Sequence, residues 1–266
     1  TTRDDRDPLN DDNVRFPRVR IQDGAGRIEF GSEPFSTSNL LDQDVFTITN
    51  NLELYKGKHT LTIGTHNEFY SSTNLFIRQN YGDYFYNSPE GFLNNDPSEL
   101  DNMFRSYSLL TSSLGDDAIE SAAVTDYAQI GFYLQDDYQV STNFKVTAGL
   151  RFDIPIFSDR PTNTDFNTRT IPLLEAAGKD LQGAIVGESI DTQVYFSPRF
   201  GFNWDINGDK RNVLRGGIGV FLSRMPMVWY AGSYNNTGTT VGGDAYFGGI
   251  SFEPDVTNQP QRVAAG

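Results

Sequence analysis

Residues 195–222 read YFSPRFGFNWDINGDKRNVLRGGIGVFL, and this stretch decides the fold class. From Tyr195 to Asp205, apolar and mostly aromatic residues alternate with polar residues and glycine. From Val213 to Leu222, one phase is mostly aliphatic and the other carries arginine and glycine. Successive side chains of a strand point to opposite faces, so each run predicts a strand with one apolar face. The Asn207-Gly208 pair between the runs predicts a tight hairpin turn, because both residues tolerate positive φ.

The same pattern occurs in two further hairpins. Residues 41–55 pair with 59–70, and residues 127–140 pair with 144–153, each across a short polar turn. The six predicted strands are roughly 10 to 15 residues long, whereas a tilted strand needs about 9 to 11 to cross a bilayer. Strands of soluble proteins are typically about 5 or 6 residues long. The strand lengths therefore favour a membrane-spanning sheet.

The connections alternate in length. Turns inside the hairpins are short, whereas long polar stretches follow at residues 71–126, 154–193 and 223 to the end. Outer-membrane barrels show this alternation, with short periplasmic turns and long extracellular loops. The sequence thus predicts an all-β, antiparallel up-and-down transmembrane β-barrel segment. We divide it into an N-terminal loop region (1–40), the barrel segment (41–225) and an extracellular loop (226–266).

Six strands are too few for a closed barrel of this class, which starts at about 8. An open sheet in lipid would leave two unsatisfied edges. Two strands could be hidden near residues 14–19 and 27–30, around Asp23-Gly24, where a loop hairpin is an equal alternative. We expect instead that the strands form an arc of a larger barrel.

Composition narrows the class of protein. The net charge of −14 argues against a nucleic-acid partner, which would need a basic surface. The absence of cysteine removes disulfides, thiol nucleophiles and cysteine metal sites. No run approaches about 18 consecutive apolar residues, so no transmembrane helix is predicted. The chain starts at Thr1, which is typical of a processed product or a part of a longer protein.

Several motifs resemble a known family. Residues 127–138 (YAQIGFYLQDDY) and 143–153 (NFKVTAGLRFD) look like paired barrel strands of TonB-dependent outer-membrane receptors. Residues 196–205 and 214–221 strengthen the likeness. The stretches IEFGSEPF from Ile28 and LDQDVFTITNN from Leu41 look like the Oar-like branch, common in Bacteroidota. The resemblance covers about residues 21–229.

The resemblance implies a barrel of about 22 strands with a plugged lumen. It further implies import of a bulky nutrient, such as an oligosaccharide, a peptide or a chelated metal, across the bacterial outer membrane. Outer-membrane lipid and TonB would be the partners, with a surface lipoprotein lid as a further candidate. This sequence departs from the family pattern, because it has no plug, no TonB box and no aromatic-ended final strand. We therefore expect it to be the middle of the barrel, with TonB bound by a segment outside this chain.

Strand parity predicts which side chains face lipid and which face the lumen. Six apolar residues should face lipid: Phe132, Leu134, Val146, Leu150, Phe200 and Phe202. Three more should form an interfacial aromatic girdle beside the short turns: Tyr138, Phe144 and Trp204. Six polar-phase residues should line the lumen: Lys145, Arg151, Asp153, Arg199, Asn203 and Arg215. These six would pair with each other or with plug residues more readily than with a ligand.

Aromatic residues in the long loops are candidate ligand contacts. They include Tyr84, Tyr86, Trp229, Tyr230 and Tyr234. Such rings could stack on sugars or peptides at a pore mouth, and packing of loop against loop is an equal alternative.

No catalytic, metal or cofactor site is predicted. Asp205, Asn207 and Asp209 have calcium-loop spacing, but a hairpin turn explains them better. His59 and His66 should lie on opposite faces of one strand, which disfavours a shared metal. We expect no enzyme. Two alternatives to a transporter remain: a structural or adhesive outer-membrane barrel without energy coupling, and a soluble secreted β-domain with its aromatic face in a core.

Overall fold

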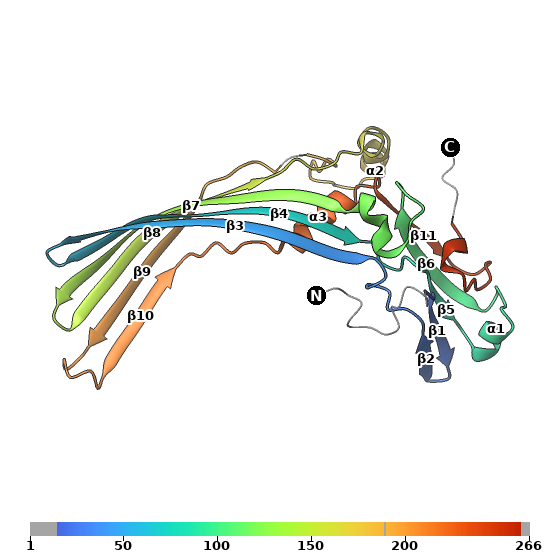
Figure 1. Ribbon diagram of the computed structural model, residues 1–266, viewed down its shortest axis with the longest axis horizontal. Helices are drawn as coiled ribbons and strands as arrows, with labels where there is room; N and C mark the ends of the chain where they lie inside the picture. The colour runs from blue at the N-terminus through green and yellow to red at the C-terminus, as the bar shows by residue number, and fades with distance from the viewer. Residues whose placement is uncertain (1–14, 189, 262–266) are drawn as a thin grey trace.

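The structure, a computed structural model, describes residues 15–188 and 190–261 and contains two β-sheets (Figure 1). The strands are β1 (Arg18–Asp23), β2 (Gly26–Phe30), β3 (Asn39–Lys56), β4 (His59–Phe76), β5 (Asp83–Tyr86), β6 (Leu100–Ser108), β7 (Ala123–Ser141), β8 (Phe144–Phe157), β9 (Tyr195–Asp205), β10 (Val213–Gly219) and β11 (Val241–Tyr246). The helices are α1 (Pro89–Leu93), α2 (Ile171–Ala176) and α3 (Met227–Asn235), with short 3₁₀ or π turns η3 (Gly115–Ser121), η4 (Phe166–Thr170) and η5 (Val256–Asn258). None of the helices in the described ranges is long and apolar enough to cross a membrane.

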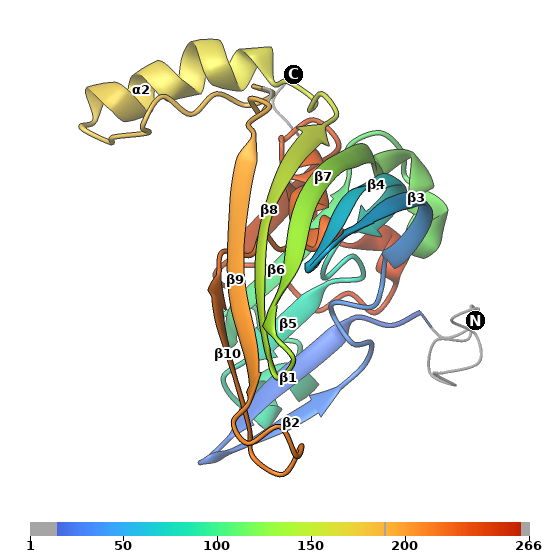
Figure 2. The same cartoon turned by 90° about the vertical axis from the view of Figure 1, so that its left-hand side faces the viewer.

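The six predicted hairpin strands form one long antiparallel sheet in the order β10-β9-β8-β7-β4-β3 (Figure 2). Each strand pairs with its neighbour in sequence among these six, so the predicted topology is confirmed. The three hairpin connections lie at one end of the sheet, here called the turn end, and the long connections lie at the loop end (Figure 1). β7 has 19 residues, which at about 3.3 Å per residue extends roughly 60 Å.

Strand bounds differ from the prediction mainly at the loop end. β4 continues to Phe76 and β7 starts at Ala123, so both enter stretches that we predicted as loop. β10 instead ends at Gly219, three residues before the predicted Leu222. Beyond it, the ring of Phe221 leaves the strand pattern and stacks under the guanidinium of Arg199, 4.7 Å from it.

The β9–β10 hairpin exists, but its turn is not the tight Asn-Gly turn that we predicted. Pairing stops at Asp205 and Val213, so residues 206–212 form the connection. The Asp205 carboxylate holds this loop by accepting hydrogen bonds from the backbone N–H groups of Gly208 (3.1 Å) and Lys210 (2.9 Å). Positive φ falls on Gly208 and Lys210 rather than on Asn207. A side-chain cap therefore outweighs the local Asn-Gly preference.

The second sheet has the order β11-β6-β5-β1-β2 and lies at the loop end of the long sheet (Figure 1). In it, residues 18–30, the first long loop and residues 241–246, which we assigned to three different regions, meet in one sheet. β1 and β2 form the local hairpin that we considered as an alternative, and β1 also pairs in parallel with β5. A core of Val19, Ile21, Tyr84, Tyr86, Leu100 and Met103 holds this sheet together. Residue 14 of the predicted fragment lies outside the described residues.

The buried carboxylate of Asp83 in the second sheet is paired with two arginines. The Asp83 carboxylate accepts a 2.9 Å hydrogen bond from Nε of Arg20, and Nη1 of Arg18 lies 3.6 Å from it. Burying a carboxylate without partners would be costly, so these arginines stabilise the sheet at the junction of β1 and β5.

The long sheet is open within the described residues. No ladder joins β3 to β10, and each has a paired neighbour on one side only. This agrees with the expected arc and excludes a six-stranded barrel closed by these two strands.

Candidate functional site

Register divides the long sheet into an apolar face and a polar face. One apolar row crosses the sheet through Leu52, Ile63, Leu134, Leu150 and Pro198. The next row toward the loop end on the same face contains Phe132, Phe152 and Phe196. A row that is shifted by one residue along each strand belongs to the opposite face. This face carries arginines, carboxylates and amides.

All six residues predicted to face lipid lie on the apolar face. Phe132 is 51% exposed and Phe200 is 49% exposed, and neither belongs to a buried core cluster. Tyr138, Phe144 and Trp204 lie on the same face at the turn end, where the rings of Phe144 and Trp204 are 6.2 Å apart. The face is therefore exposed and mostly apolar, with aromatic rings at its turn end.

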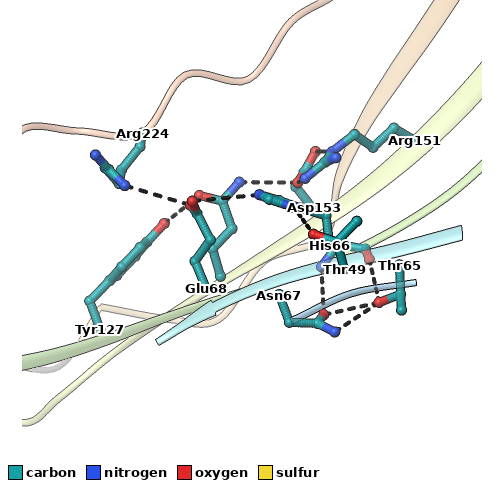
Figure 3. Close-up of polar contacts among 11 residues, drawn as sticks. Thr49, Thr65, His66, Asn67, Glu68, Tyr127, Arg151, Asp153 and Arg224 are labelled. Atoms are coloured by element: carbon teal, nitrogen blue, oxygen red, sulfur yellow. Dashed lines mark hydrogen bonds and ion pairs between the residues drawn. The ribbon is translucent and has the colours of Figure 1, made fainter. Parts of the chain in front are cut away.

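Two polar side chains on the apolar face are satisfied internally. Thr65 Oγ1 donates to the carbonyl oxygen of Gly131 at 2.8 Å, and Asn67 Oδ1 accepts from the Gly131 N–H at 3.2 Å. Asn67 Nδ2 also donates to Thr65 Oγ1 at 2.9 Å (Figure 3). Such closure is what a lipid-facing surface requires, because hydrocarbon offers no hydrogen-bond partner.

All six residues predicted to face the lumen share the polar face. Lys145, Asn203 and Arg215 follow one another in a single row, while Arg151 faces Ser197 and Arg199 faces Gly149. Asp153 lies two residues beyond Arg151 on β8. Strand parity thus placed these side chains on one face of the sheet, and their contact with a lumen stays a prediction.

An ion pair forms the centre of the polar face. Arg151 Nε lies 2.9 Å from each oxygen of Asp153, and its Nη2 lies 2.7 Å from Oδ1. Asp153 is 1% exposed, and it also accepts a 3.0 Å hydrogen bond from Gln129 Nε2. Tyr127 donates to Gln129 Oε1 at 2.9 Å, which extends the network to the next row.

A second set of polar contacts crosses the first strands of the sheet. The Thr49 hydroxyl and His66 Nδ1 are 2.7 Å apart, and His66 Nε2 lies 3.5 Å from Glu68. The other carboxylate oxygen of Glu68 lies 3.6 Å from Arg224, which belongs to the segment after β10 (Figure 3). Arg224 also lies 4.5 Å from the centre of the Tyr70 ring.

These contacts show that the chain after β10 returns across the polar face. Residues 220–226 run from β10 beneath the long sheet, and α3 then packs against Tyr70, Tyr127 and Phe157 near the loop end (Figure 1). The hydroxyls of Tyr230 and Tyr234 both donate to the carbonyl oxygen of Ser158, at 3.2 and 2.7 Å. This segment, residues 220–235, is called the strap below.

A hollow of about 320 Å³ lies beside the ion pair on the polar face. Its polar-face lining consists of His66, Tyr133, Gln135, Gly149, Arg151 and Arg199. Gly149 lies between Gln135 and Arg199 in the register, so no side chain rises between them. Lys145, nearer the turn end, has its own partner, because its Nζ lies 3.5 Å from Asp137.

Four of the five loop aromatics are buried inside the protein. Tyr84 and Tyr86 are fully buried in the second-sheet core, and burial raises the pKa of both hydroxyls. Tyr230 and Tyr234 are buried between α3 and the long sheet. The packing alternative is therefore correct for these four, because each ring fills a core that the loops build together. Trp229 remains a candidate, since it is 73% exposed.

Sequence reasoning missed the contribution of His66, Glu68, Gln129 and Arg224 to the polar network. The first three lie on the polar phase of their strands, so strand parity could have included them. Arg224 could not be placed, because its contact with Glu68 joins residues far apart in sequence through an irregular segment. His59 lies on the other face, where it contacts Asp136 at 2.7 Å. Within residues 15–188 and 190–261, no cluster of His, Cys, Asp or Glu is arranged to hold a metal ion.

Comparison with known proteins decides the family. The model of a family described as "Outer membrane beta barrel domain" matches residues 5–260. The chain belongs to this family. No curated protein and no solved structure matches it.

Membership of the outer membrane beta barrel domain family gives a location. The chain is an outer-membrane protein, and its structure consists mostly of strands. This overturns the alternative of a soluble secreted β-domain. An apolar outward face is typical of such barrels, and the exposed Phe132 and Phe200 fit this pattern.

Proposed function

We propose that the chain is part of the wall of a large outer-membrane transporter that imports a bulky nutrient by coupling to TonB. The observation that carries this proposal is the open arc, in which six long strands leave both edges, β3 and β10, without a closing ladder. Lipid does not tolerate such edges, so further strands must continue the wall on both sides. A barrel with more strands has a wider lumen, and outer-membrane transporters of about 22 strands enclose a plugged one.

The polar face supports a transport role. On it, Arg151 and Gln129 are joined to the buried Asp153 carboxylate by hydrogen bonds. The interior of an outer-membrane barrel is polar, and in large transporters it encloses a water-filled or plugged lumen. We assign no catalytic role to these groups.

Partners follow from this assignment. The apolar face would contact outer-membrane lipid, and TonB would act through a segment outside this chain. The second sheet would lie on the extracellular side, because the short turns of such barrels are periplasmic. A surface lipoprotein lid over this sheet is a further candidate partner.

Uptake by cells that carry the complete protein tests the proposal. We would compare the wild type, a deletion of the gene and a deletion of TonB, using labelled oligosaccharides, oligopeptides and a chelated metal. The expected result is that one class of solute enters only when both genes are present and the inner membrane is energised. Uptake that persists after loss of TonB or dissipation of the proton gradient would contradict energy coupling.

A structural or adhesive barrel is the second candidate. The second sheet favours it, because this separately cored body projects at the loop end and could bind a surface (Figure 1). In that case, deletion of the gene should change cell adhesion or envelope integrity and leave uptake of every solute class unchanged.

A further inference from the structure

We infer that the hollow around Arg199 is a binding subsite for an oxyanion, a carboxylate or phosphate group carried by the transported solute. This inference rests on the proposed transport function and names the chemistry of the solute. The charge of the residues that line the hollow differs in sign from the net charge of the chain. The chain has 35 acidic and 21 basic residues, yet the lining contains two arginines and a histidine and no carboxylate.

The two arginines are not equivalent. Asp153 neutralises Arg151 by contacting its Nε and Nη2. Among residues 15–188 and 190–261, no carboxylate lies within ion-pair distance of Arg199. Arg199 therefore contributes the uncompensated positive charge of the hollow.

The strap orients this charge. The Arg199 guanidinium lies 4.7 Å from the centre of the Phe221 ring, so one of its faces is covered. Stacking leaves the N–H groups at the edge of the guanidinium free to donate. A planar fork of donors suits carboxylate and phosphate oxygens, which can accept two parallel hydrogen bonds.

The other lining residues shape the hollow. Tyr133 is fixed by its hydroxyl, which donates to Asn51 Oδ1, and His66 is fixed by the Thr49 hydroxyl at 2.7 Å. Gly149 leaves the space between Gln135 and Arg199 open. The hollow therefore combines an exposed arginine, whose guanidinium stacks on Phe221, with two lining side chains that are held by hydrogen bonds.

Calorimetric titration of the complete protein in detergent tests the inference. Citrate is the carboxylate probe, pyrophosphate the phosphate probe and glucose the neutral probe, all at constant ionic strength. We expect citrate or pyrophosphate, and not glucose, to bind, and the better of the two identifies the oxyanion. Arg199→Gln should weaken binding about tenfold or more, the loss expected for a charge-assisted hydrogen-bond donor.

Two further variants separate recognition from folding. In Gly149→Val, the added Cβ would lie at ordinary contact distances, 3.4 Å from the Leu134 carbonyl oxygen and 3.6 Å from Gln135 Cβ, so the fold should hold while the hollow fills. It should weaken oxyanion binding as Arg199→Gln does. The matched control is Arg211→Gln, which removes a charge from the β9–β10 turn and should change the affinity by less than about twofold.

Three results would overturn the inference: no oxyanion binding by the wild type, unchanged affinity in folded Arg199→Gln or Gly149→Val, or an equal loss in Arg211→Gln. Folding of each variant is checked by its shift on heating in SDS gels. If energised uptake persists while oxyanions fail to bind, the inference falls and the transport function stands. If oxyanions bind but no solute uptake depends on TonB, the proposed function falls instead.

Discussion

Arg151 and Asp153 are two residues apart on β8, and their side chains lie against each other on the polar face, with Arg151 Nη2 2.7 Å from Asp153 Oδ1. The carboxylate is almost fully buried, and Gln129 donates to the same oxygen at 3.0 Å. Replacing Asp153 by asparagine should therefore leave Arg151 without its counter-charge.

We expect Asp153→Asn to destabilise the protein by about 3 kcal/mol, because breaking a buried ion pair strands the remaining charge. Urea unfolding in lipid vesicles, followed by fluorescence, measures the change. The control is Asp209→Asn, which breaks an exposed pair with Arg211 at 3.9 Å and should cost less than about 1 kcal/mol. Equal costs for the two variants would argue against a special role for Asp153.

Gly64 makes room for an aromatic ring on the polar face. A Cβ at position 64 would lie 2.4 Å from Cζ of Tyr133. Gly64→Ala should therefore destabilise the protein by about 1 to 3 kcal/mol through overpacking. Gly201→Ala is the control, since its Cβ would meet only the Gly216 carbonyl oxygen at 3.6 Å. The same unfolding assay measures the stability of both variants. If Gly64→Ala leaves the stability unchanged, the Tyr133 ring is free to move away from position 64.

A charged residue introduced on the apolar face should destabilise the protein. Phe200→Arg should cost about 2 to 4 kcal/mol, because the guanidinium would lie in hydrocarbon. Leu93→Arg offers a comparison, since Leu93 is also exposed but belongs to α1 beside the second sheet, where we expect a change within about 0.5 kcal/mol. If both variants cost the same, the face around Phe200 does not contact lipid.

Trp204 should lie at the interface between lipid and water. It is on the apolar face at the turn end, next to Phe144. The difference in fluorescence between the wild type and Trp204→Phe reports on this ring alone. Bromine placed near the lipid headgroup should quench it more strongly than bromine at the chain ends. The reverse order would show that the register or the position of the membrane is wrong.

Burial of Tyr84 should make the second sheet sensitive to alkali. Desolvation is the main cause that raises the Tyr84 pKa above its ordinary value near 10. A raised pKa in the folded state stabilises the sheet fully below about pH 10, and this contribution is lost as the pH rises through the folded value. Tyrosine absorbance should show Tyr84 ionising only as the sheet unfolds, and Tyr84→Phe should lessen the pH dependence. Ionisation of Tyr84 near pH 10 with the sheet intact would contradict its burial.

The long sheet was predictable because strand parity is a local property. Alternation alone placed Arg151 and Phe132 on opposite faces, and short turns fixed the order of strands. The second sheet was not predictable in this way, because β1 pairs in parallel with β5 across more than 50 intervening residues. Tyr84 and Tyr86 were misjudged for the same reason, since their burial depends on contacts between distant loops.

The candidate site was only partly predictable. Arg199 was placed correctly on the polar face, but its stacking on Phe221 depends on the chain leaving β10 at Gly219. The return of the strap to Glu68 through Arg224 has no local pattern in the sequence. Three glycines near the end of β10 weaken strand propensity there. They are the one local signal in the sequence that the strand ends before residue 222.

Cysteine cross-linking between the edge strands tests the central claim most directly. The chain has no cysteine of its own, so engineered pairs stand out. Glu53→Cys on β3 would be combined with Thr62→Cys, its partner on β4, and separately with cysteine at each of Arg215, Gly217 and Gly219 on β10. Disulfides form only when the Cα atoms lie within about 7 Å of each other. An open arc predicts oxidation of the β3–β4 pair and none of the β3–β10 pairs in the complete protein in its membrane. A disulfide between Glu53→Cys and any β10 position would show that the six strands close on themselves, and the large barrel and its transport function would be wrong.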